Sequence, residues 1–456
     1  MSPRIVIVGA GVSGLATASF LLEAAPDAEV TVLEATDRAG GNVRTIQAGG
    51  TSVEAGPDAI VTGRPEVTRL ATRLGLDAEL MAPRAEAGRV LVARGSKLVP
   101  MPDGLVLGVP SGMRALATTP LLSMRGKLRA AMDLLLPQGD DEPRSLGHLV
   151  ERRLGREVKD HLVEPLIGGV LAADIDRLDP SAGGPALAGA RGSLIRAMAK
   201  AKRPAGNPLR APRSGMHALV DALVDDVGAS RIRLGTSVAD VRREGQRGYV
   251  VELASGKRLS SDHLVLAVPP HAASRLIAGL DPELATSLDE LRAVSTATVV
   301  LVFPEGTALP PSSGLLVPRI EGRALLAATF VNTKWSRASE TGEVVVRAYL
   351  GGARSPELVD AGDDDALVRR ALDDLRVYLS LPDPVGARVT RFDRATPQPE
   401  LGHHARVARV RARAAMVPGL SLVSAAYEGP GIAGCVAQAA AVAGRVFPRT
   451  GAEVAS

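Results

Sequence analysis

The sequence predicts an α/β protein whose parallel sheet is assembled from segments far apart in the chain. A wholly apolar strand, a glycine-rich turn and a helix open the chain over residues 5–24, which is typical of a buried parallel strand followed by its crossover helix. A second strand, glycine turn and helix close it over residues 420–446. Between these units the pattern changes from helical to β-branched and strand-like, which indicates insertions into the parallel-sheet domain.

The opening unit is the clearest pattern. Ile5–Val8 and Val30–Leu33 are short apolar strands, and the residues from Leu15 to Ala24 are good helix formers. Further helices are predicted over residues 64–82, 120–137, 145–154, 157–166, 193–201, 216–227, 363–379 and 437–446. Further strands are predicted over residues 89–99 (or a hairpin there), 232–234, 238–241, 249–253, 263–268, 294–303, 323–331, 343–350 and 420–424. Residues 179–213 are interpreted as a loop around the helix at 193–201.

Composition restricts the classes of function. The chain has 456 residues, 46% of them hydrophobic and 23% charged, which is typical of a soluble globular protein with several domains. Only 2% are aromatic and the net charge is +4, so we expect no nucleic-acid partner, because such sites need aromatic platforms or a concentrated basic patch. The single cysteine, Cys435, excludes an internal disulfide and a multi-cysteine metal site. We expect no metal and a cytoplasmic location.

A dinucleotide-binding motif follows the first strand. Gly9, Gly11 and Gly14, with Ala10, Val12 and Ser13 between them, form a G-x-G-x-x-G turn that leads into a helix. The glycines permit a tight turn, a close backbone approach to a pyrophosphate and helix–strand packing, and the helix N-terminus supplies free N–H groups. Glu34 ends the second strand 20 residues after Gly14, where an acid accepts hydrogen bonds from ribose hydroxyls.

The residues after Glu34 favour FAD over NAD. Arg38, the pair Gly40–Gly41 and Thr45 extend the fingerprint, and this extension resembles the flavin amine oxidase superfamily. The resemblance implies that the glycine pair approaches the FAD pyrophosphate, with Arg38 as an electrostatic partner. It also implies the domain plan. The FAD-binding domain is predicted over residues 1–80, 206–268 and 396–448, the mixed-sheet substrate domain over 81–102 and 269–395, the inserted helical lobe over 103–205, and a tail over 449–456.

Further segments resemble one branch of that superfamily, the porphyrinogen oxidases. The similarity spans roughly residues 3–447, and the segments that carry it are 56–59, 98–110, 123–129, 164–173 and 426–435. The resemblance implies additional FAD contacts from Ala35, Asn42, Gly56, Pro57, Asp58, Ala59, Val238, His404, Pro430, Gly431 and Ile432. Pro399 departs from the family, which usually has an aromatic residue after Pro-Gln.

Two residues are candidates for contact with the substrate. The Asp58 carboxylate has two open interpretations: acceptor of a pyrrole proton, or local turn cap. The carbonyl of Gly169 is interpreted as an acceptor for pyrrole N–H groups.

The resemblance implies an FAD-dependent oxidase of haem biosynthesis. Non-covalent FAD would accept six hydrogens in three cycles from a tetrapyrrole, either protoporphyrinogen IX or coproporphyrinogen III, and oxygen would reoxidise it. An amine oxidase or carotenoid desaturase on the same fold, and a flavin- or porphyrin-binding carrier without turnover, stay open as alternatives. The scarcity of Trp and Tyr disfavours an amine-binding aromatic cage.

The predicted helix over 120–137 has an apolar stripe with basic residues beside it. Leu121, Met124, Leu128, Met132 and Leu135 form the stripe, and Arg125, Lys127 and Arg129 accompany it. We interpret the stripe as packed within the helical lobe. A weak peripheral membrane contact and a homodimer are left open.

Overall fold

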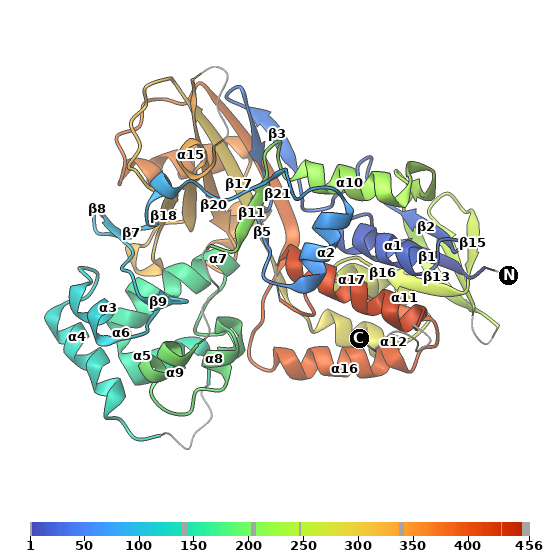
Figure 1. The fold of residues 1–456 in the computed structure, drawn as a ribbon, viewed down its shortest axis with the longest axis horizontal. Coiled ribbons are helices and arrows are strands. Elements are labelled where there is room, and N and C mark those ends of the chain that lie inside the picture. Colours follow the sequence, from blue (N-terminus) through green and yellow to red (C-terminus); the bar gives the residue numbers. More distant parts are fainter. Residues whose placement is uncertain are drawn as a thin grey trace.

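The computed structural model describes residues 2–138, 144–201, 207–245, 248–336, 342–429 and 431–448. They form three bodies: a parallel-sheet domain, a mixed sheet, and a lobe of short helices below that sheet (Figure 1). The α/β class with a discontinuous Rossmann-like domain, a mixed sheet and an inserted helical lobe is confirmed. The predicted tail, 449–456, lies outside the described residues.

The parallel sheet draws its strands from both ends and the middle of the chain. Its order is β12-β2-β1-β16-β22, and every neighbouring pair is parallel. The strands are β1 (Arg4–Val8), β2 (Glu29–Leu33), β12 (Ile232–Arg233), β16 (His263–Leu266) and β22 (Leu420–Leu422).

Helices cover both faces of this sheet, which explains why its strands are apolar throughout. Ile5 and Ile7 of β1 join the core on one face, while Val6 and Val8 join the core on the other. The first face is covered by α1 (Val12–Ala24), α2 (Pro65–Arg73), α10 (His217–Val227) and α17 (Ile432–Val446). The second is covered by α11 (Pro270–Ile277), α12 (Pro282–Asp289) and α16 (His403–Ala415).

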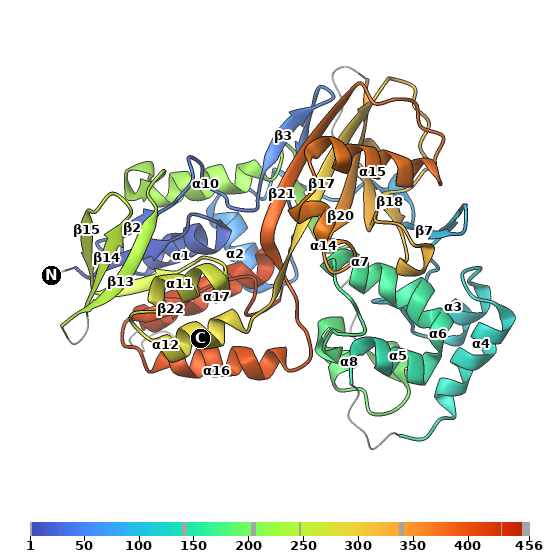
Figure 2. The same ribbon diagram turned by 180° about the vertical axis from the view of Figure 1, so that it is seen from behind.

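The mixed sheet has the order β21-β17-β20-β19-β18-β7-β8. Its strands are β7 (Leu91–Arg94), β8 (Lys97–Pro100), β17 (Ala293–Phe303), β18 (Gly314–Leu316), β19 (Ala327–Phe330), β20 (Val344–Gly351) and β21 (Gly386–Pro397). Helix α15 (Asp364–Arg376) packs on one face and completes a third core. The long strands β17 and β21 lean toward the parallel-sheet domain (Figure 2).

The helical lobe has its own core. Its helices are α3 (Met113–Thr118), α4 (Met124–Ala131), α5 (Leu146–Leu154), α6 (Arg156–Val158), α7 (Gly169–Leu171), α8 (Pro185–Ala188) and α9 (Leu194–Lys200), with the π-helix η3 (Lys159–Gly168) between α6 and α7. A buried ion pair, Arg153 Nε to Asp133 Oδ1 at 2.6 Å, ties α5 to the segment after α4. Asp133 also accepts from the backbone N–H of Ile195 at 3.0 Å.

Smaller elements connect these bodies. The remaining helices are α13 (Val331–Lys334) and α14 (Pro356–Asp360), with 3-10 turns at 85–87, 132–134, 180–183, 229–231 and 319–321. The smaller sheets are formed by β3 (Thr45–Ala48) with β4 (Thr51–Glu54), by β5 (Ile60–Val61), β11 (Leu209–Pro212) and β6 (Leu80–Met81), by β9 (Leu105–Val106) with β10 (Val109–Pro110), and by β13 (Val238–Glu244), β14 (Gly248–Leu253) and β15 (Arg258–Ser261). No helix among the described residues is long and apolar enough to cross a membrane.

Several predicted boundaries are wrong. The helix expected over 64–82 ends at Arg73, because Gly75 adopts a left-handed φ of 70° and the Leu76 N–H bonds back to the Ala71 carbonyl, a Schellman-type stop. The segment 179–213 contains two additional helical turns and the strand β11. Strand β21 was not predicted, because its sequence intersperses charged with other residues and lacks the apolar run that is typical of a buried strand.

The interpretation of the apolar stripe is also wrong. The helix is shorter than 120–137, and only Leu121 of the stripe is buried. Exposed fractions are 68% for Met124, 66% for Leu128, 50% for Met132 and 85% for Leu135. The stripe therefore faces outward from the lobe.

The first glycine turn gives a test of the fold with a matched control. A Cβ on Gly14 would lie 1.9 Å from the Gly9 carbonyl oxygen, whereas one on Gly444, also helical, would meet no atom within 4 Å. We predict that Gly14→Ala lowers the free energy of unfolding by roughly 1–3 kcal/mol, while Gly444→Ala raises it by about 0.5–1 kcal/mol. Urea denaturation of the protein without added FAD measures both. Equal effects of the two substitutions would contradict the packing described here.

Candidate active site

One large cleft lies between the parallel-sheet domain and the mixed sheet, with a volume of about 570 Å³. The parallel-sheet domain contributes the glycine turn, the end of β2, the loop 40–43, the loop 55–57 and the start of α17. The mixed sheet contributes β17, β20 and β21, and Val170 of α7 reaches in from the helical lobe. Twelve of the predicted cofactor residues line it: Gly9, Gly11, Val12, Ser13, Glu34, Gly40, Gly41, Asn42, Gly56, Pro57, Gly431 and Ile432.

The glycine turn is closed tightly against its surroundings. Gly9 has a φ of 104°, and a Cβ there would lie 2.6 Å from the Ala267 carbonyl oxygen. Ala10 and Gly14 are placed behind the turn rather than in the cleft wall. Because Gly11 directly precedes α1, the free N–H groups of the first helical turn face the cleft, which suits a phosphate group.

Glu34 braces this turn. One carboxylate oxygen accepts from the Ala10 N–H at 2.9 Å, and the other accepts from the N–H and hydroxyl of Thr36 at 3.0 and 2.9 Å. The carboxylate is half-buried at the carboxyl edge of the sheet and lines the cleft. It can accept hydrogen bonds from ribose hydroxyls there while it also fixes the conformation of the turn.

The second glycine pair lies against the first turn. The Gly40 N–H donates to the Ala10 carbonyl at 2.8 Å, and a Cβ on Gly41 would lie 3.1 Å from the Cα of Gly11. Arg38 does not line the cleft: its guanidinium donates to the carbonyls of Ala39, Gly41 and Val43. Arg38 therefore holds the loop in shape, and its electrostatic role toward the cofactor stays a prediction.

The loop 55–58 is joined to the mixed sheet through a buried cation. Arg347 of β20 donates to the Gly56 carbonyl at 2.5 Å, and its guanidinium lies 3.2 Å from the Asp58 carboxylate. Lys334 lies 2.6 Å from the same carboxylate. Gly56 also fits closely against the preceding loop, since a Cβ there would lie 1.9 Å from the Asn42 carbonyl oxygen.

Asp58 is consequently a poor proton acceptor. Burial alone would raise its pKa, but the charges of Lys334 and Arg347 outweigh burial and lower the pKa of Asp58 to about 2. Its carboxylate belongs to this ion cluster and does not line the cleft. These ion pairs favour a role for Asp58 in attaching the loop to the mixed sheet, and its predicted contacts with cofactor and substrate stay predictions.

Other predicted site residues lie elsewhere. His404 is exposed on α16, with its Nε2 2.6 Å from the Ser181 hydroxyl of the helical lobe. Gly169 is buried and precedes Val170, and its carbonyl already accepts from the Ala172 N–H at 3.3 Å. Residues that do not line the cleft also include Ala35, Ala59 and Val238. Pro430 lies outside the described residues.

The wall formed by the mixed sheet was missed from the sequence. Thr296, Thr298, Tyr349, Phe392 and Arg394 line the cleft. The alternation of Thr296 and Thr298 within an apolar strand is a signal for one polar face. No local pattern identifies Tyr349, Phe392 and Arg394, because the direction in which they point depends on how β20 and β21 pair with β17.

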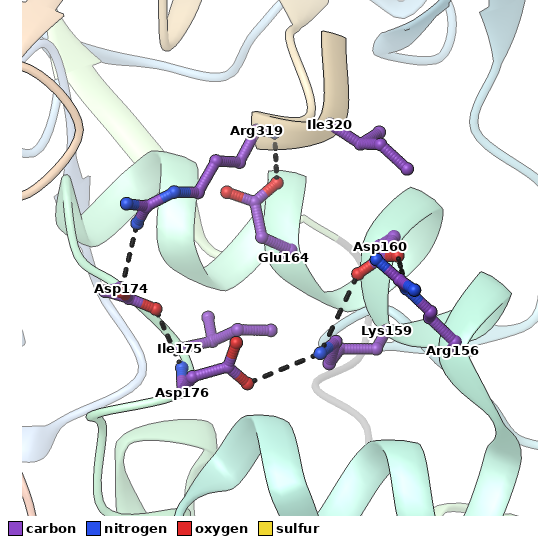
Figure 3. A pocket seen from close by; sticks show the side chains of 9 residues that line it. All are labelled: Arg156, Lys159, Asp160, Glu164, Asp174, Ile175, Asp176, Arg319 and Ile320. Carbon is purple, nitrogen blue, oxygen red and sulfur yellow. Dashed lines mark hydrogen bonds and ion pairs between the residues drawn. The ribbon is translucent and has the colours of Figure 1, made fainter. Parts of the chain in front are cut away.

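A smaller recess lies between the helical lobe and the 3-10 turn at 319–321 (Figure 3). Glu164 of the π-helix accepts from the Arg319 N–H at 2.8 Å and pairs with the half-buried Arg354 at 3.0 Å. Burial raises the pKa of Glu164, although Arg354 acts in the opposite direction. Other charged side chains of the recess pair with one another, for example Arg319 with Asp174 at 3.1 Å and Lys159 with Asp176 at 3.5 Å. Ion pairs and hydrogen bonds around the recess therefore connect the helical lobe to the mixed sheet.

The cleft suits an extended dinucleotide with an aromatic head group. Two helices, α1 and α17, begin at it, and glycines bring the backbone to its surface at several points. Among the described residues, no group of three or more His, Cys, Asp or Glu side chains could hold a metal. The glycine turns, the helix N-termini and Glu34 fit FAD, which would supply the redox chemistry when bound.

The ion cluster at Asp58 gives a stability test. Asp58→Asn leaves Lys334 and Arg347 uncompensated, so we predict a loss of about 3 kcal/mol in the free energy of unfolding at pH 7. Because the folded pKa of Asp58 is lowered to about 2, its contribution is complete above pH about 4 and declines as the pH falls toward 2. The two proteins should therefore converge in acid. Asp262→Asn, which breaks an exposed pair with Arg4, is the control and should change stability by less than about 1 kcal/mol.

Glu34 gives a test of cofactor binding. Glu34→Gln keeps the shape of the side chain but removes a charge-assisted hydrogen bond, so FAD affinity should fall about tenfold or more. Glu29→Gln, on the exposed end of the same strand, is the control. Titration of the FAD-free protein with FAD measures both, and an unchanged affinity for Glu34→Gln would exclude the acid from the ribose site.

Comparison with known proteins places the chain in a family. Residues 12–447 match the family of flavin containing amine oxidoreductases. The chain is 32% identical to coproporphyrinogen III oxidase from Bacillus subtilis (strain 168), covering 95% of this chain and 96% of that one. It is 33% identical to the protein of the same name from Mycobacterium bovis, with 100% of both covered. Chloroplastic protoporphyrinogen oxidase of Nicotiana tabacum is 30% identical, with 87% of this chain and 76% of that one covered.

Comparison with solved structures leads to the same family as the sequence comparisons. A crystal structure from Exiguobacterium sp. 255-15, provisionally named as a protoporphyrinogen oxidase, superposes with a TM-score of 0.87 at 29% identity, covering 98% of this chain and 99% of that one. The chain thus belongs to the flavin containing amine oxidoreductase family and, within it, to the porphyrinogen oxidase branch.

Proposed function

We propose that the protein oxidises coproporphyrinogen III to coproporphyrin III in haem biosynthesis, with FAD as cofactor and oxygen as acceptor. The observation that carries this proposal is the two-sided cleft. One wall is a glycine-lined dinucleotide cradle. The other presents Thr296, Thr298, Tyr349 and Phe392, and among the described residues its only charged side chains are Arg292 and Arg394. Such a wall suits a flat, apolar ring, and relatives with that activity match over the whole chain.

The reaction needs little acid–base chemistry from the protein. Six hydrogens leave the substrate in three two-electron steps, and three molecules of oxygen become three of hydrogen peroxide. When bound, FAD supplies the hydride acceptor and passes the electrons to oxygen. The chain's own residues hold the ring against the cofactor and exclude water from the contact.

We propose that the FAD is held without a covalent bond. Cys435 lies in the cleft wall on α17, but it is buried, and burial raises the pKa of its thiol. A protonated thiol is a weak nucleophile, so attachment at this residue is disfavoured. Acid precipitation should release the FAD into solution, and a yellow pellet with a colourless supernatant would contradict the proposal.

We also propose a cytoplasmic protein with a weak peripheral membrane contact. The exposed residues Met124, Leu128, Met132 and Leu135, with Arg125 and Lys127 nearby, support it, because apolar and basic groups together favour anionic lipid surfaces. Sedimentation with anionic vesicles tests it, and equal sedimentation with neutral vesicles would contradict the electrostatic part.

Steady-state kinetics with the two candidate porphyrinogens test the catalytic proposal. Porphyrin should form in air with three peroxide molecules each, and kcat/KM should be higher for coproporphyrinogen III than for protoporphyrinogen IX. Added salt should raise KM with little change in kcat, because a remote charge contact is uniform binding. The rise should be steeper for coproporphyrinogen, which has four carboxylates rather than two. Porphyrin formation no faster than the spontaneous rate would overturn the function.

A further inference from the structure

Two arginines line the cleft outside the cofactor cradle. Arg292 directly precedes β17, and Arg394 lies within β21. Among the described residues that line the cleft, the only other charged side chain is Glu34, which is bonded to Ala10 and Thr36. The unbalanced charge of the cleft is therefore positive, and it lies on the mixed-sheet wall.

The backbone at Arg394 is built to present this side chain. Strands β17 and β21 pair at Val294 with Thr396 and again at Thr296 with Phe392, so one residue of β17 faces three of β21. Within this bulge Arg394 has a φ of 42°, a left-handed conformation that costs a non-glycine residue about 1 kcal/mol or more. Bulges of this kind redirect a side chain.

A buried serine holds the bulge in place. The Ser295 hydroxyl accepts from the Arg394 N–H at 3.2 Å and donates to the Asp393 carboxylate at 3.2 Å. Ser295 itself is 6% exposed. The strained conformation is therefore fixed by the fold.

Both guanidinium groups are available to a ligand. That of Arg394 forms no hydrogen bond or ion pair with any described residue, and its side chain is exposed. Arg292 has only a distant partner, Glu400 at 3.8 Å, and Arg177 holds Glu400 more closely at 3.0 Å. Arg292 is also 62% exposed.

We propose that Arg292 and Arg394 form the site that binds the propionate carboxylates of the tetrapyrrole, an inference that rests on the proposed function. The planar guanidinium binds a carboxylate through two parallel hydrogen bonds. Ser295 of β17 lies opposite Arg394. Arg292 lies three residues before Ser295, so the backbones of Arg292 and Ser295 are about 10 Å apart along the strand direction. That spacing suits two carboxylates of one ring system. The apolar ring would lie deeper, against Thr298, Tyr349 and Phe392.

The cofactor pyrophosphate is the other anion that could meet these arginines. It is expected at the first turn of α1, on the cradle wall, where free N–H groups already face the cleft. Measurement of FAD affinity separates the two sources.

The test compares Arg394→Gln, Arg292→Gln and the double variant with Arg388→Gln, which removes an exposed cation from the same strand outside the cleft. Holoenzymes are titrated with coproporphyrin III and with its uncharged tetramethyl ester, and steady-state kinetics are run with coproporphyrinogen III. We expect the Kd for coproporphyrin and the KM to rise about tenfold for each single variant and further for the double variant. The Kd for the ester, the Kd for FAD and kcat should stay within about twofold of wild type, and Arg388→Gln should match wild type.

The outcomes separate this inference from the function on which it rests. Normal turnover by wild type with an unchanged coproporphyrin Kd in the double variant would overturn the inference alone. An equal loss of ester binding would also overturn it, since the arginines would then support the ring rather than the charge. A weakened FAD affinity would assign them to the pyrophosphate instead. Failure of wild type to oxidise or bind any tetrapyrrole would overturn the proposed function and the inference with it.

Discussion

A single buried cation, Arg347, joins the two walls of the cleft. It stands on β20 of the mixed sheet with 2% of its side chain exposed, yet it bonds to Gly56 and pairs with Asp58 from the parallel-sheet domain. A buried cation is stable only with compensating charge and hydrogen bonds, so the loop 55–58 must stay in place to supply them. That loop in turn packs against Asn42 without room for a Cβ. One ion cluster and one glycine contact therefore hold this loop between the two walls.

Close contacts between glycines connect this loop to the glycine turn that forms the cofactor cradle. The loop at Asn42 follows the Gly40–Gly41 pair, which lies against Gly11, and Arg38 fixes the pair by binding three of its neighbouring carbonyls. Glu34 then braces Ala10 from the end of β2. Arg38 and Asp58, which were predicted to contact the cofactor, bind backbone groups or ion partners that hold the loops at the surface of the cleft. Such support is what a site needs when the cofactor performs the chemistry.

The cradle could be predicted from the sequence, whereas the opposite wall could not. Gly9, Gly11, Gly14 and Glu34 belong to one βαβ unit, so local spacing fixes their relation. The surface formed by Tyr349, Phe392 and Arg394 depends on strand pairing between distant residues, since Thr298 pairs with Tyr349 and Thr296 pairs with Phe392. It also depends on a bulge that no local pattern indicates. The ion pairs of Asp58 could not be predicted from the sequence, because Lys334 and Arg347 are distant from it in the chain. The stripe near Met124 was assigned to a core because apolar periodicity does not say what covers a helix face.

The central claim is that the cleft brings a porphyrinogen into direct redox contact with bound FAD, and anaerobic mixing tests it most directly. Holoenzyme without oxygen is mixed with coproporphyrinogen III in a stopped-flow instrument, and the absorbance of the oxidised flavin is followed. The flavin should be reduced in a fast phase that saturates with substrate, and admission of oxygen should restore its absorbance. A flavin that stays oxidised in the presence of coproporphyrinogen III and protoporphyrinogen IX, while both bind, would identify a carrier and contradict the assignment.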